Sequence, residues 1–362
     1  MEDNYSKEII KEYHTKLSDY ESFCQNIEQL IKRLLETEEI NYYSLNKRVK
    51  TIESLKNKLI KKGNKYKTLS DITDLAGIRI ITYYSDQVDK IAKIIEQEFE
   101  VDKENTIDKR KIMDPDKFGY ISLHYIIKLN TARKQLREYE HFKEFKAEIQ
   151  IRTILQHAWA DIEHDLGYKS KDTIPRDIQR DFNRLSGLLE LADKEFLGIR
   201  NSLSKYKDYV SSNINKDDEE ILLDKISFVE FVNTNQQLKQ LNQKIAEICG
   251  GDLIEYDYPE KFLQYFQLLE IKTVRELNSA LLEDKDLAYC IAQKILINEK
   301  HSIIYTTIGL FYLFYARISK IPDMNKIYTI LSKTIIHFDS DNERWDFVNK
   351  LIEIFKSFQE KK

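Results

Sequence analysis

Apolar side chains recur along the chain with two different spacings, and each spacing predicts a different element. Residues 5–35 repeat them at intervals of three and four, which is the spacing of a helix face and predicts one long helix or two in line. Residues 118–125 and 148–153 instead alternate apolar and polar positions, which predicts two strands. The chain therefore combines helices with a sheet.

Further stretches connect this pattern into an α/β arrangement. Residues 71–81 read as an acidic turn followed by a short strand that contains Gly77, and residues 85–99 follow as an amphipathic helix. A strand, a helix and a strand in succession predict a sheet with helices packed on it. Pro175 then opens a long helix that continues to about Tyr206.

The first two predicted strands each carry a row of polar and ionisable side chains. Because side chains alternate along a strand, each row shares one face, and the apolar residues between them face the core. The two rows together suit a polar ligand with several charges, although the wet side of an ordinary half-buried strand pair would also be polar. The rows are Tyr120, Ser122 and His124 on the first strand, and Glu148, Gln150 and Arg152 on the second.

Residues 47–67 hold nine lysines and arginines and a single acid. An apolar stripe predicts that most of this segment is helical, which places Ser54 and Lys58 on the same side because they are four residues apart. Arg48 and Lys50 come just before the helix, near its positive end. Such cations could clamp a triphosphate. The alternative is a basic face in contact with solvent.

Three smaller features each carry two interpretations. Asp74 stands at the entrance of a strand, where it could bind magnesium or hydrogen-bond its own backbone in the turn. Residues 131–139 form either a mobile basic segment near a ligand or a solvated helix. His157, Asp161 and His164 follow helical spacing, and form either a metal row or a packing surface.

The chain has 362 residues, of which 42% are hydrophobic and 33% charged, and this is enough for two domains of a globular protein. Its net charge of −4 does not suit a general polyanion binder, so any basic site has to be local. Three unclustered cysteines form no metal or disulfide motif and favour a reducing compartment. The N-terminus does not resemble a signal peptide, and the most apolar run, residues 303–318, is short for a membrane span; we expect a buried helix in a cytoplasmic protein without membrane contact.

Composition changes at a polar and acidic stretch over residues 211–220, which is the predicted linker. Before it we expect an N-terminal helical segment at residues 1–40 and an α/β domain at residues 41–210. After it, residues 221–362 are helical by their spacing and show no paired nucleophile and base, no metal spacing and no phosphate loop. We expect this all-helical domain to serve regulation or interaction with a partner.

Four motifs in order along the chain resemble the synthetase domain of the RelA/SpoT-type alarmone synthetases. The match spans roughly residues 40–205 and implies an α/β, nucleotidyltransferase-like mixed sheet flanked by helices. The run from Gln156 to Ala160, with Glu163 and His164, is similar to single-domain members of the family. The motifs are Arg48-x-Lys50 with Ser54 and Lys58, Asp74-Leu-Ala-Gly-Ile-Arg79, Gly119-Tyr120-x-Ser122-x-His124, and Glu148-Ile-Gln150-Ile-Arg152-Thr153.

The resemblance implies a pyrophosphokinase that uses ATP and Mg²⁺. Arg48, Asp74 and Glu148 would be catalytic; the two carboxylates would bind Mg²⁺, and Glu148 would take the proton from the 3′-hydroxyl of the acceptor. The ATP-binding residues would be Arg48, Lys50, Ser54, Lys58 and Arg79. The acceptor-binding residues would be Tyr120, whose ring would stack on the acceptor base, and Ser122, His124, Gln150 and Arg152.

Three functions are compatible with this resemblance. The first is transfer of pyrophosphate from ATP to the 3′-hydroxyl of GDP or GTP, which makes (p)ppGpp. The second is transfer to the 3′ end of tRNA by a toxin that its C-terminal region restrains, as in the CapRel-type toxin–antitoxin fusions. The third is an inactive module that binds a nucleotide or a partner, against which the intact set of catalytic residues speaks.

Two departures from the family pattern bear on these alternatives. Asn usually precedes the Gly-Tyr pair, but Phe118 stands here, and this leaves recognition of the acceptor base open. The hydrolase domain of the family has no counterpart before Arg48, so we expect synthesis without degradation. A homo-oligomer is also compatible with the sequence.

Overall fold

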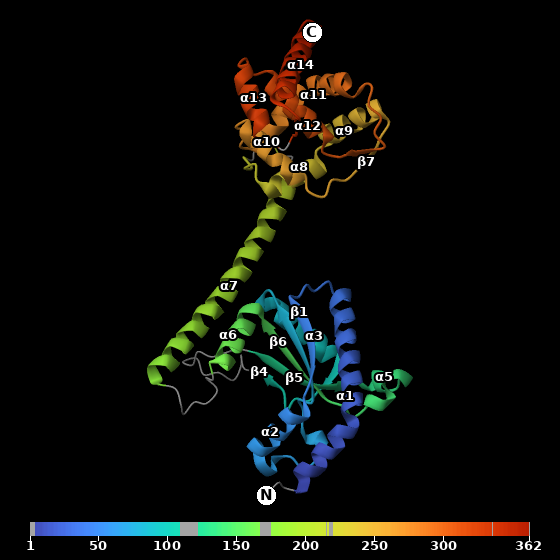
Figure 1. Ribbon diagram of the computed structural model, residues 1–362, viewed down its shortest axis with the longest axis vertical. Helices are drawn as coiled ribbons and strands as arrows, with labels where there is room; N and C mark the ends of the chain where they lie inside the picture. Colours follow the sequence, from blue (N-terminus) through green and yellow to red (C-terminus); the bar gives the residue numbers. More distant parts are fainter. Residues whose placement is uncertain are drawn as a thin grey trace. The chain divides into compact units, whose positions relative to one another are not determined.

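The computed structural model of the protein describes residues 4–108, 122–166, 175–214, 216, 220–334 and 336–361 (Figure 1). The chain forms two compact units, Met1–Asn201 and Ser202–Lys362, and each has a hydrophobic core of its own. In the part of the chain that the structure describes, no helix is both long and apolar enough to cross a bilayer.

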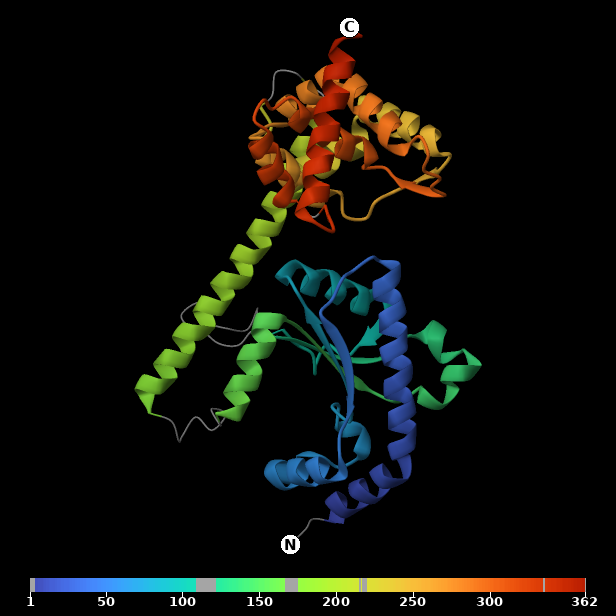
Figure 2. The same ribbon diagram turned by 45° about the horizontal axis from the view of Figure 1, so that its top comes forward.

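A mixed sheet forms the centre of the first unit, as Figure 2 shows. Its strands lie in the order β1–β2–β6–β5–β3, and β4 pairs with β5. β2 and β6 are parallel, whereas the other pairs are antiparallel. The strands are β1 (Ser44–Val49), β2 (Ala76–Thr82), β3 (Phe99–Val101), β4 (Ile107–Asp108), β5 (Leu123–Leu129) and β6 (Ala147–Thr153). The predicted α/β class with a mixed sheet flanked by helices is confirmed.

Two helices, α1 (Asn4–Thr37) and α3 (Ser85–Glu98), cover the apolar face of this sheet. Alternate strand residues such as Ile78 and Ile149 are fully buried in the same core as Ile27 of α1. Because successive side chains of a strand point to opposite faces, the residues between them point away from α1 and α3. His124 of the first polar row and the three members of the second row, Glu148, Gln150 and Arg152, therefore share the other face.

Two helices begin where strands of the polar face end. α2 (Ile52–Lys62) follows β1, and its N-cap Thr51 accepts a hydrogen bond from the backbone nitrogen of Ser54 at 3.1 Å. α6 (Ile154–Asp165) follows β6 directly and is capped by Thr153. The sequence analysis predicted both helices but not β1, because this edge strand buries only one of its six side chains, that of Leu45.

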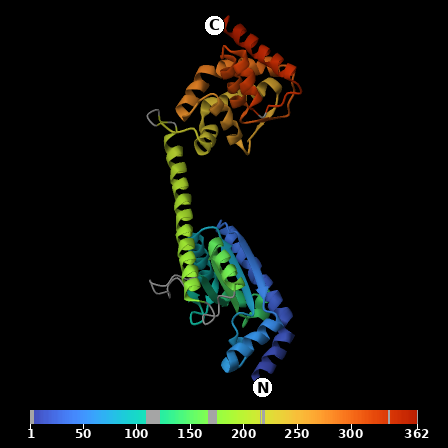
Figure 3. The ribbon, with the colours of Figure 1, turned by 60° about the vertical axis from the view of Figure 1, so that its left-hand side comes forward.

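α7 (Arg176–Asn213) is one continuous helix, visible in Figure 3, and contributes residues to both units. In the first unit, the Thr153 hydroxyl donates a hydrogen bond to Asp193 Oδ2 at 2.7 Å. The Arg200 guanidinium donates to both carboxylate oxygens of Asp86, at 3.0 and 2.9 Å. The predicted helix thus runs beyond Tyr206, and the predicted linker at residues 211–220 begins within it.

Among its described residues, the second unit is helical apart from one pair of short parallel strands that the sequence did not predict, β7 (Asp252–Ile254) and β8 (Ile303–Tyr305). α12 (Ile308–Ser319) is mostly buried, as predicted for residues 303–318, although the first three of these residues form β8. α12 packs against α11 (Val274–Leu296). The other α-helices described in this unit are α8 (Lys225–Thr234), α9 (Gln236–Cys249), α10 (Leu263–Leu268), α13 (Met324–Ser332) and α14 (Asp341–Gln359).

The contact between α7 and β6 yields a prediction on stability. Burial raises the pKa of Asp193 although the Thr153 hydroxyl favours its charged form. At pH values just above the usual aspartate range, Asp193 therefore holds its proton in the native state but loses it in the unfolded state. The contribution of Asp193 to the free energy of unfolding thus becomes less favourable as pH rises through this range. We expect Asp193→Asn, whose amide oxygen can still accept from Thr153, to be at least as stable as the wild type at pH 7, with a gain that vanishes in acid.

The measurement is chemical unfolding of the full chain from pH 3 to pH 8, followed by Trp159 fluorescence in a Trp345→Phe background. Asp208→Asn, an exposed change on the same helix, should alter the free energy of unfolding by about 0.5 kcal/mol or less at every pH. A larger loss of stability at pH 7 than at pH 3 for Asp193→Asn would contradict the argument.

Candidate active site

Strand pairing brings the polar side chains together on the face opposite α1 and α3. Arg48 of β1 pairs with Gly77 of β2, which pairs with Glu148 of β6. Paired residues share a face of a sheet, so the register alone assembles this row. One step along the strands, the pairing assembles a second row of Asn46, Arg79, Gln150 and His124.

A cavity of about 470 Å³ lies over these rows, and we call it the first cavity. Gly77 has no side chain, so space remains between its neighbours Arg48 and Glu148. Four cations and two carboxylates border the space, which suits a chain of phosphates together with a divalent metal ion. The lining residues are Asn46, Lys47, Arg48, Lys50, Asp74, Gly77, Ile78, Arg79, Glu148 and Gln150.

Asp74 is held by two lysines at the entrance of β2. Its Oδ2 lies 3.1 Å from Lys50 Nζ, and its Oδ1 lies 2.8 Å from Lys58 Nζ. Burial alone would raise the pKa of Asp74, but the two ammonium groups outweigh it and leave the pKa below its usual value. The turn is held by Asp71 instead, which accepts from the backbone nitrogens of Lys67 and Thr68. The geometry thus favours the interpretation that Asp74 belongs to a charged binding site and not to the hydrogen bonds of the turn.

Glu148 takes part in a chain of hydrogen bonds along the sheet. Its Oε1 lies 2.8 Å from His124 Nδ1, and His124 Nε2 lies 2.6 Å from the Ser122 hydroxyl. Burial would raise the pKa of Glu148, and the negative charge of Asp74 acts in the same direction. The contacts with His124 and with the side chain of Gln150 outweigh both, so that the pKa of Glu148 is lowered overall. Both carboxylates of the first cavity are therefore ionised at neutral pH.

A second cavity, of about 590 Å³, adjoins the first. The two share Arg48, Arg79 and Gln150, so ligands in them would lie next to one another. The sheet adds His124 and Arg152 to its lining. The rest comes from the C-terminal half of α6, namely Ala160, Asp161, Glu163, His164 and Asp165.

The structure brings most of the predicted site residues to these two cavities. Lys58 and Ser122 do not line them but bond to Asp74 and His124, which do. Ser54 borders neither cavity, and its hydroxyl accepts a hydrogen bond from Thr51 at 2.8 Å. The predicted acceptor-stacking residue Tyr120, together with Phe118, lies outside the described residues.

Two side chains of α1 that hold this face from behind were not predicted from the sequence. The Tyr13 hydroxyl donates to the carbonyl oxygen of Lys50 at 2.5 Å, and the Cys24 thiol to that of Gly77 at 3.5 Å. Burial raises the pKa of Tyr13 to about 12 and also raises the pKa of Cys24, so both remain protonated donors. On a predicted helix they look like ordinary core residues, and only the position of α1 reveals their role.

In two further predicted features, basic side chains contact acidic ones. In the predicted basic segment, Arg133 and Lys134 pair with Glu98 at 2.5 Å and Glu100 at 2.6 Å, which agrees with a surface helix. In the predicted metal row on α6, His157 Nδ1 lies 3.5 Å from Asp161 Oδ1. Within the described ranges no three His, Cys, Asp or Glu side chains gather as metal ligands.

The donor set of the first cavity nevertheless fits magnesium. Mg²⁺ in proteins is commonly bound by one or two carboxylates, with water and substrate phosphates completing an octahedron. Asp74 and Glu148 are ionised and border the same space. These two side chains would hold the ion, and phosphate oxygens would supply further ligands.

In comparisons with known proteins, the part of the chain that matches is the part that lines the two cavities. Residues 47–173 match the family model described as "Region found in RelA / SpoT proteins". The GTP pyrophosphokinase YwaC of Bacillus subtilis (strain 168) is 33% identical over 156 residues, which cover 42% of this chain and 71% of YwaC. The GTP pyrophosphokinase YjbM of the same organism is 28% identical over 163 residues, 44% of this chain and 72% of YjbM.

Solved structures also align with this chain. The small alarmone synthetase 1 from Bacillus subtilis, bound to its product pppGpp, is 25% identical and aligns with a TM-score of 0.45 over 54% of this chain and 99% of that one. The small alarmone synthetase 2 from the same organism is 28% identical, with a TM-score of 0.40 over 54% and 98%.

The shared sequence shows that the chain belongs to the RelA/SpoT family, and that it is an enzyme of the pyrophosphokinase type. The match to the family model contains every residue predicted for the site. The resemblance seen in the sequence is confirmed at the level of the family.

Gly77 allows the space in the first cavity to be tested without disturbing the fold. A Cβ atom there would lie 3.5 Å from the carbonyl oxygen of Arg48 and 3.8 Å from that of Glu148, which are ordinary contacts. We expect Gly77→Ala to keep the unfolding temperature of the wild type but to weaken binding of ATP about tenfold, because the methyl group occupies ligand space.

Titration calorimetry with ATP measures this effect, and Gly198→Ala on α7, where a Cβ meets nothing within 4 Å, is the control. Wild-type affinity in Gly77→Ala would mean that the phosphates do not approach this part of the sheet.

Proposed function

We propose that this chain transfers the pyrophosphate group of ATP to the 3′-hydroxyl of GDP or GTP, and so makes (p)ppGpp. The observation that carries the proposal is the pair of ionised carboxylates, Asp74 and Glu148, among the cations of one cavity that opens into a second. The relatives named GTP pyrophosphokinases support a guanine nucleotide as the acceptor.

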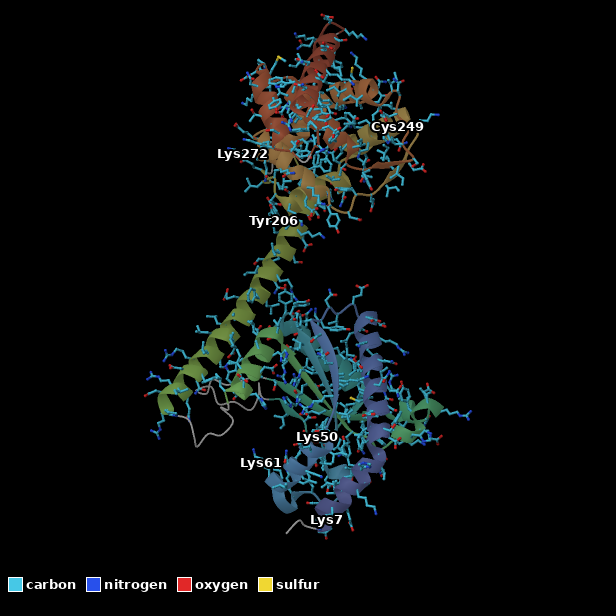
Figure 4. The ribbon with its side chains drawn as sticks, viewed as in Figure 1. Lys7, Lys50, Lys61, Tyr206, Cys249 and Lys272 are labelled. Atoms are coloured by element: carbon cyan, nitrogen blue, oxygen red, sulfur yellow. The ribbon has the colours of Figure 1, made fainter. Side chains whose placement is uncertain are left out.

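In this proposal the first cavity holds the triphosphate of ATP. Arg48, Lys50 and Arg79 border the space. Lys58 does not line the cavity but pairs with Asp74, which does. Figure 4 labels Lys50, in the segment between β1 and α2. Without a ligand, Lys50 and Lys58 both pair with Asp74, whose single negative charge offsets only one of theirs. Arriving phosphates would share these cations instead of requiring new ones to be buried.

The second cavity holds the acceptor in this proposal. Gln150 and the two arginines Arg48 and Arg79 border both cavities, so the acceptor sugar would meet the phosphate chain there. Arg152 adds a further cation for the acceptor phosphates. The predicted contribution of Tyr120, stacking on the acceptor base, stays a prediction.

The reaction then follows from the positions of these groups. The acceptor 3′-oxygen attacks the β-phosphorus of ATP, and the bond from that phosphorus to the α–β bridging oxygen breaks, so that AMP leaves. Glu148 accepts the proton of the 3′-hydroxyl, for which its lowered pKa keeps it ionised. The cations stabilise the charge that spreads over the phosphate oxygens. Magnesium held by Asp74 and Glu148 would add charge neutralisation at the phosphates.

The proposal is tested by incubating the full chain with ATP labelled on the γ-phosphate, in the presence of Mg²⁺ and of GDP, GTP or tRNA in separate reactions. We expect label to enter the guanine nucleotide and an equal amount of AMP to form, because the transferred group keeps the γ-phosphate. Label in none of the acceptors would contradict the proposal and favour an inactive binding module.

Removal of the base gives a second test. We expect Glu148→Gln to lower kcat by about a hundredfold or more, the usual contribution of a general base, while ATP still binds. Glu144→Gln is the matched control, because its side chain is 84% exposed and pairs only with Lys128 among the described residues. Full turnover in Glu148→Gln would remove Glu148 from the mechanism.

One observation favours tRNA as a second candidate acceptor. α2 exposes Lys56, Lys61 and Lys62, and none of them forms an ion pair within the described part of the chain; Figure 4 labels Lys61. Exposed cations on the helix that also carries Lys58, a neighbour of Asp74, suit a nucleic-acid backbone. Label in tRNA, with a yield that falls steeply as salt is raised, would replace the first candidate by this one.

A further inference from the structure

We infer that His124 is a positioning residue for the base Glu148, and that Ser122 acts through His124. This inference rests on the proposed function, because it assigns a role to the hydrogen-bond chain behind the base. Both residues are predicted from the sequence to bind the acceptor; in the structure His124 contacts the carboxylate of Glu148, and Ser122 contacts His124.

The hydrogen-bond chain from Ser122 through His124 to Glu148 consists of two short contacts. His124 pairs with Gln150 across β5 and β6, and its ring reaches diagonally to Glu148, two residues before Gln150. The His124 Nδ1 to Glu148 Oε1 distance is 2.8 Å, and the His124 Nε2 to Ser122 Oγ distance is 2.6 Å. Ser122 is 1% exposed, so its hydroxyl contacts the ring from inside the protein.

The direction of these hydrogen bonds follows from what each group can donate. An ionised carboxylate carries no proton, so Nδ1 donates to Glu148 whether the ring is neutral or charged. A serine hydroxyl can both donate and accept, so Ser122 satisfies Nε2 in either state. The carboxylate of Glu148 therefore favours the tautomer with hydrogen on Nδ1, and Ser122 fixes the rotation of the ring.

This arrangement matters because Glu148 has competing partners. Lys50 and Lys58 lie around Asp74, in or beside the same cavity, and a free glutamate side chain could turn toward them. With Oε1 held by His124 and the side chain of Gln150 also hydrogen-bonded to the carboxylate, Glu148 keeps a fixed orientation toward the acceptor hydroxyl. A displacement of about 1 Å of a reacting group can lower a rate about a hundredfold.

His124 also borders the second cavity, so a direct contact with the acceptor is the rival role. The two roles differ in the kinetic constant that they control. Loss of a contact with the bound acceptor raises its KM, whereas a misplaced base lowers kcat and leaves both KM values unchanged.

Two substitutions test the two ring nitrogens of His124 separately. The amide nitrogen of asparagine reaches the place of Nδ1, and that of glutamine reaches the place of Nε2. We expect His124→Asn to keep kcat within about fivefold of the wild type, and His124→Gln to lower it about a hundredfold, with both KM values within about twofold. His141→Asn, an exposed change in the same unit, is the control.

Ser122→Ala tests whether the hydroxyl acts through the ring. We expect kcat to fall about fivefold in the wild-type background, because the hydrogen bond that orients the ring is lost. In the His124→Asn background the same change should add nothing, since residues that act as one unit are not additive. Additive losses, or a raised acceptor KM with unchanged kcat, would overturn the inference.

A measurement that needs no turnover separates this inference from the proposed function. ¹⁵N spectra of histidine-labelled protein, with His124 assigned by its loss in His124→Asn, report which ring nitrogen carries hydrogen. We expect hydrogen on Nδ1 in the wild type and also in Ser122→Ala, because the Glu148 carboxylate still accepts from that nitrogen. A bare Nδ1 in the wild type would overturn the inference even if transfer to GDP is observed. If no acceptor gains label but Nδ1 is protonated, the proposed function fails and the contact stands.

Discussion

The burial of two negative charges in one cavity is the constraint on which the rest of the structure depends. Two carboxylates that share a site repel each other, and burial favours their neutral forms. Here Lys50 and Lys58 hold Asp74, and His124 holds Glu148, so that both stay ionised. This balance requires β2 and β6 to be neighbours, because β2 follows Asp74 and β6 carries Glu148.

The opposite face of the sheet fixes this arrangement. The core beneath α1 and α3 packs on the opposite side of these strands and so positions the polar face from behind. Tyr13 and Cys24 of α1 bond directly to backbone carbonyls of Lys50 and Gly77, next to the cations and at the floor of the first cavity. The core and the site are thus connected by hydrogen bonds as well as by packing.

Alternation along two strands was enough to predict that Glu148, Gln150 and Arg152 share a face, because side-chain direction in a strand depends only on local geometry. β1 could not be predicted, since an edge strand with one buried residue has no apolar pattern. Asn46, Tyr13 and Cys24 join the site or its support only through strand register and helix packing, which link residues far apart in sequence. In the second unit, spacing predicted the helices, whereas β7 and β8 have three residues each and leave no pattern.

A crystal structure of the full chain with Mg²⁺, a non-hydrolysable ATP analogue and GDP tests the central claim most directly. The account predicts phosphates between Arg48, Lys50 and Lys58, and the GDP 3′-oxygen within hydrogen-bond distance of Glu148 and in line with the β-phosphorus. Phosphates bound away from Asp74 and Glu148, or a 3′-hydroxyl facing away from Glu148, would contradict it.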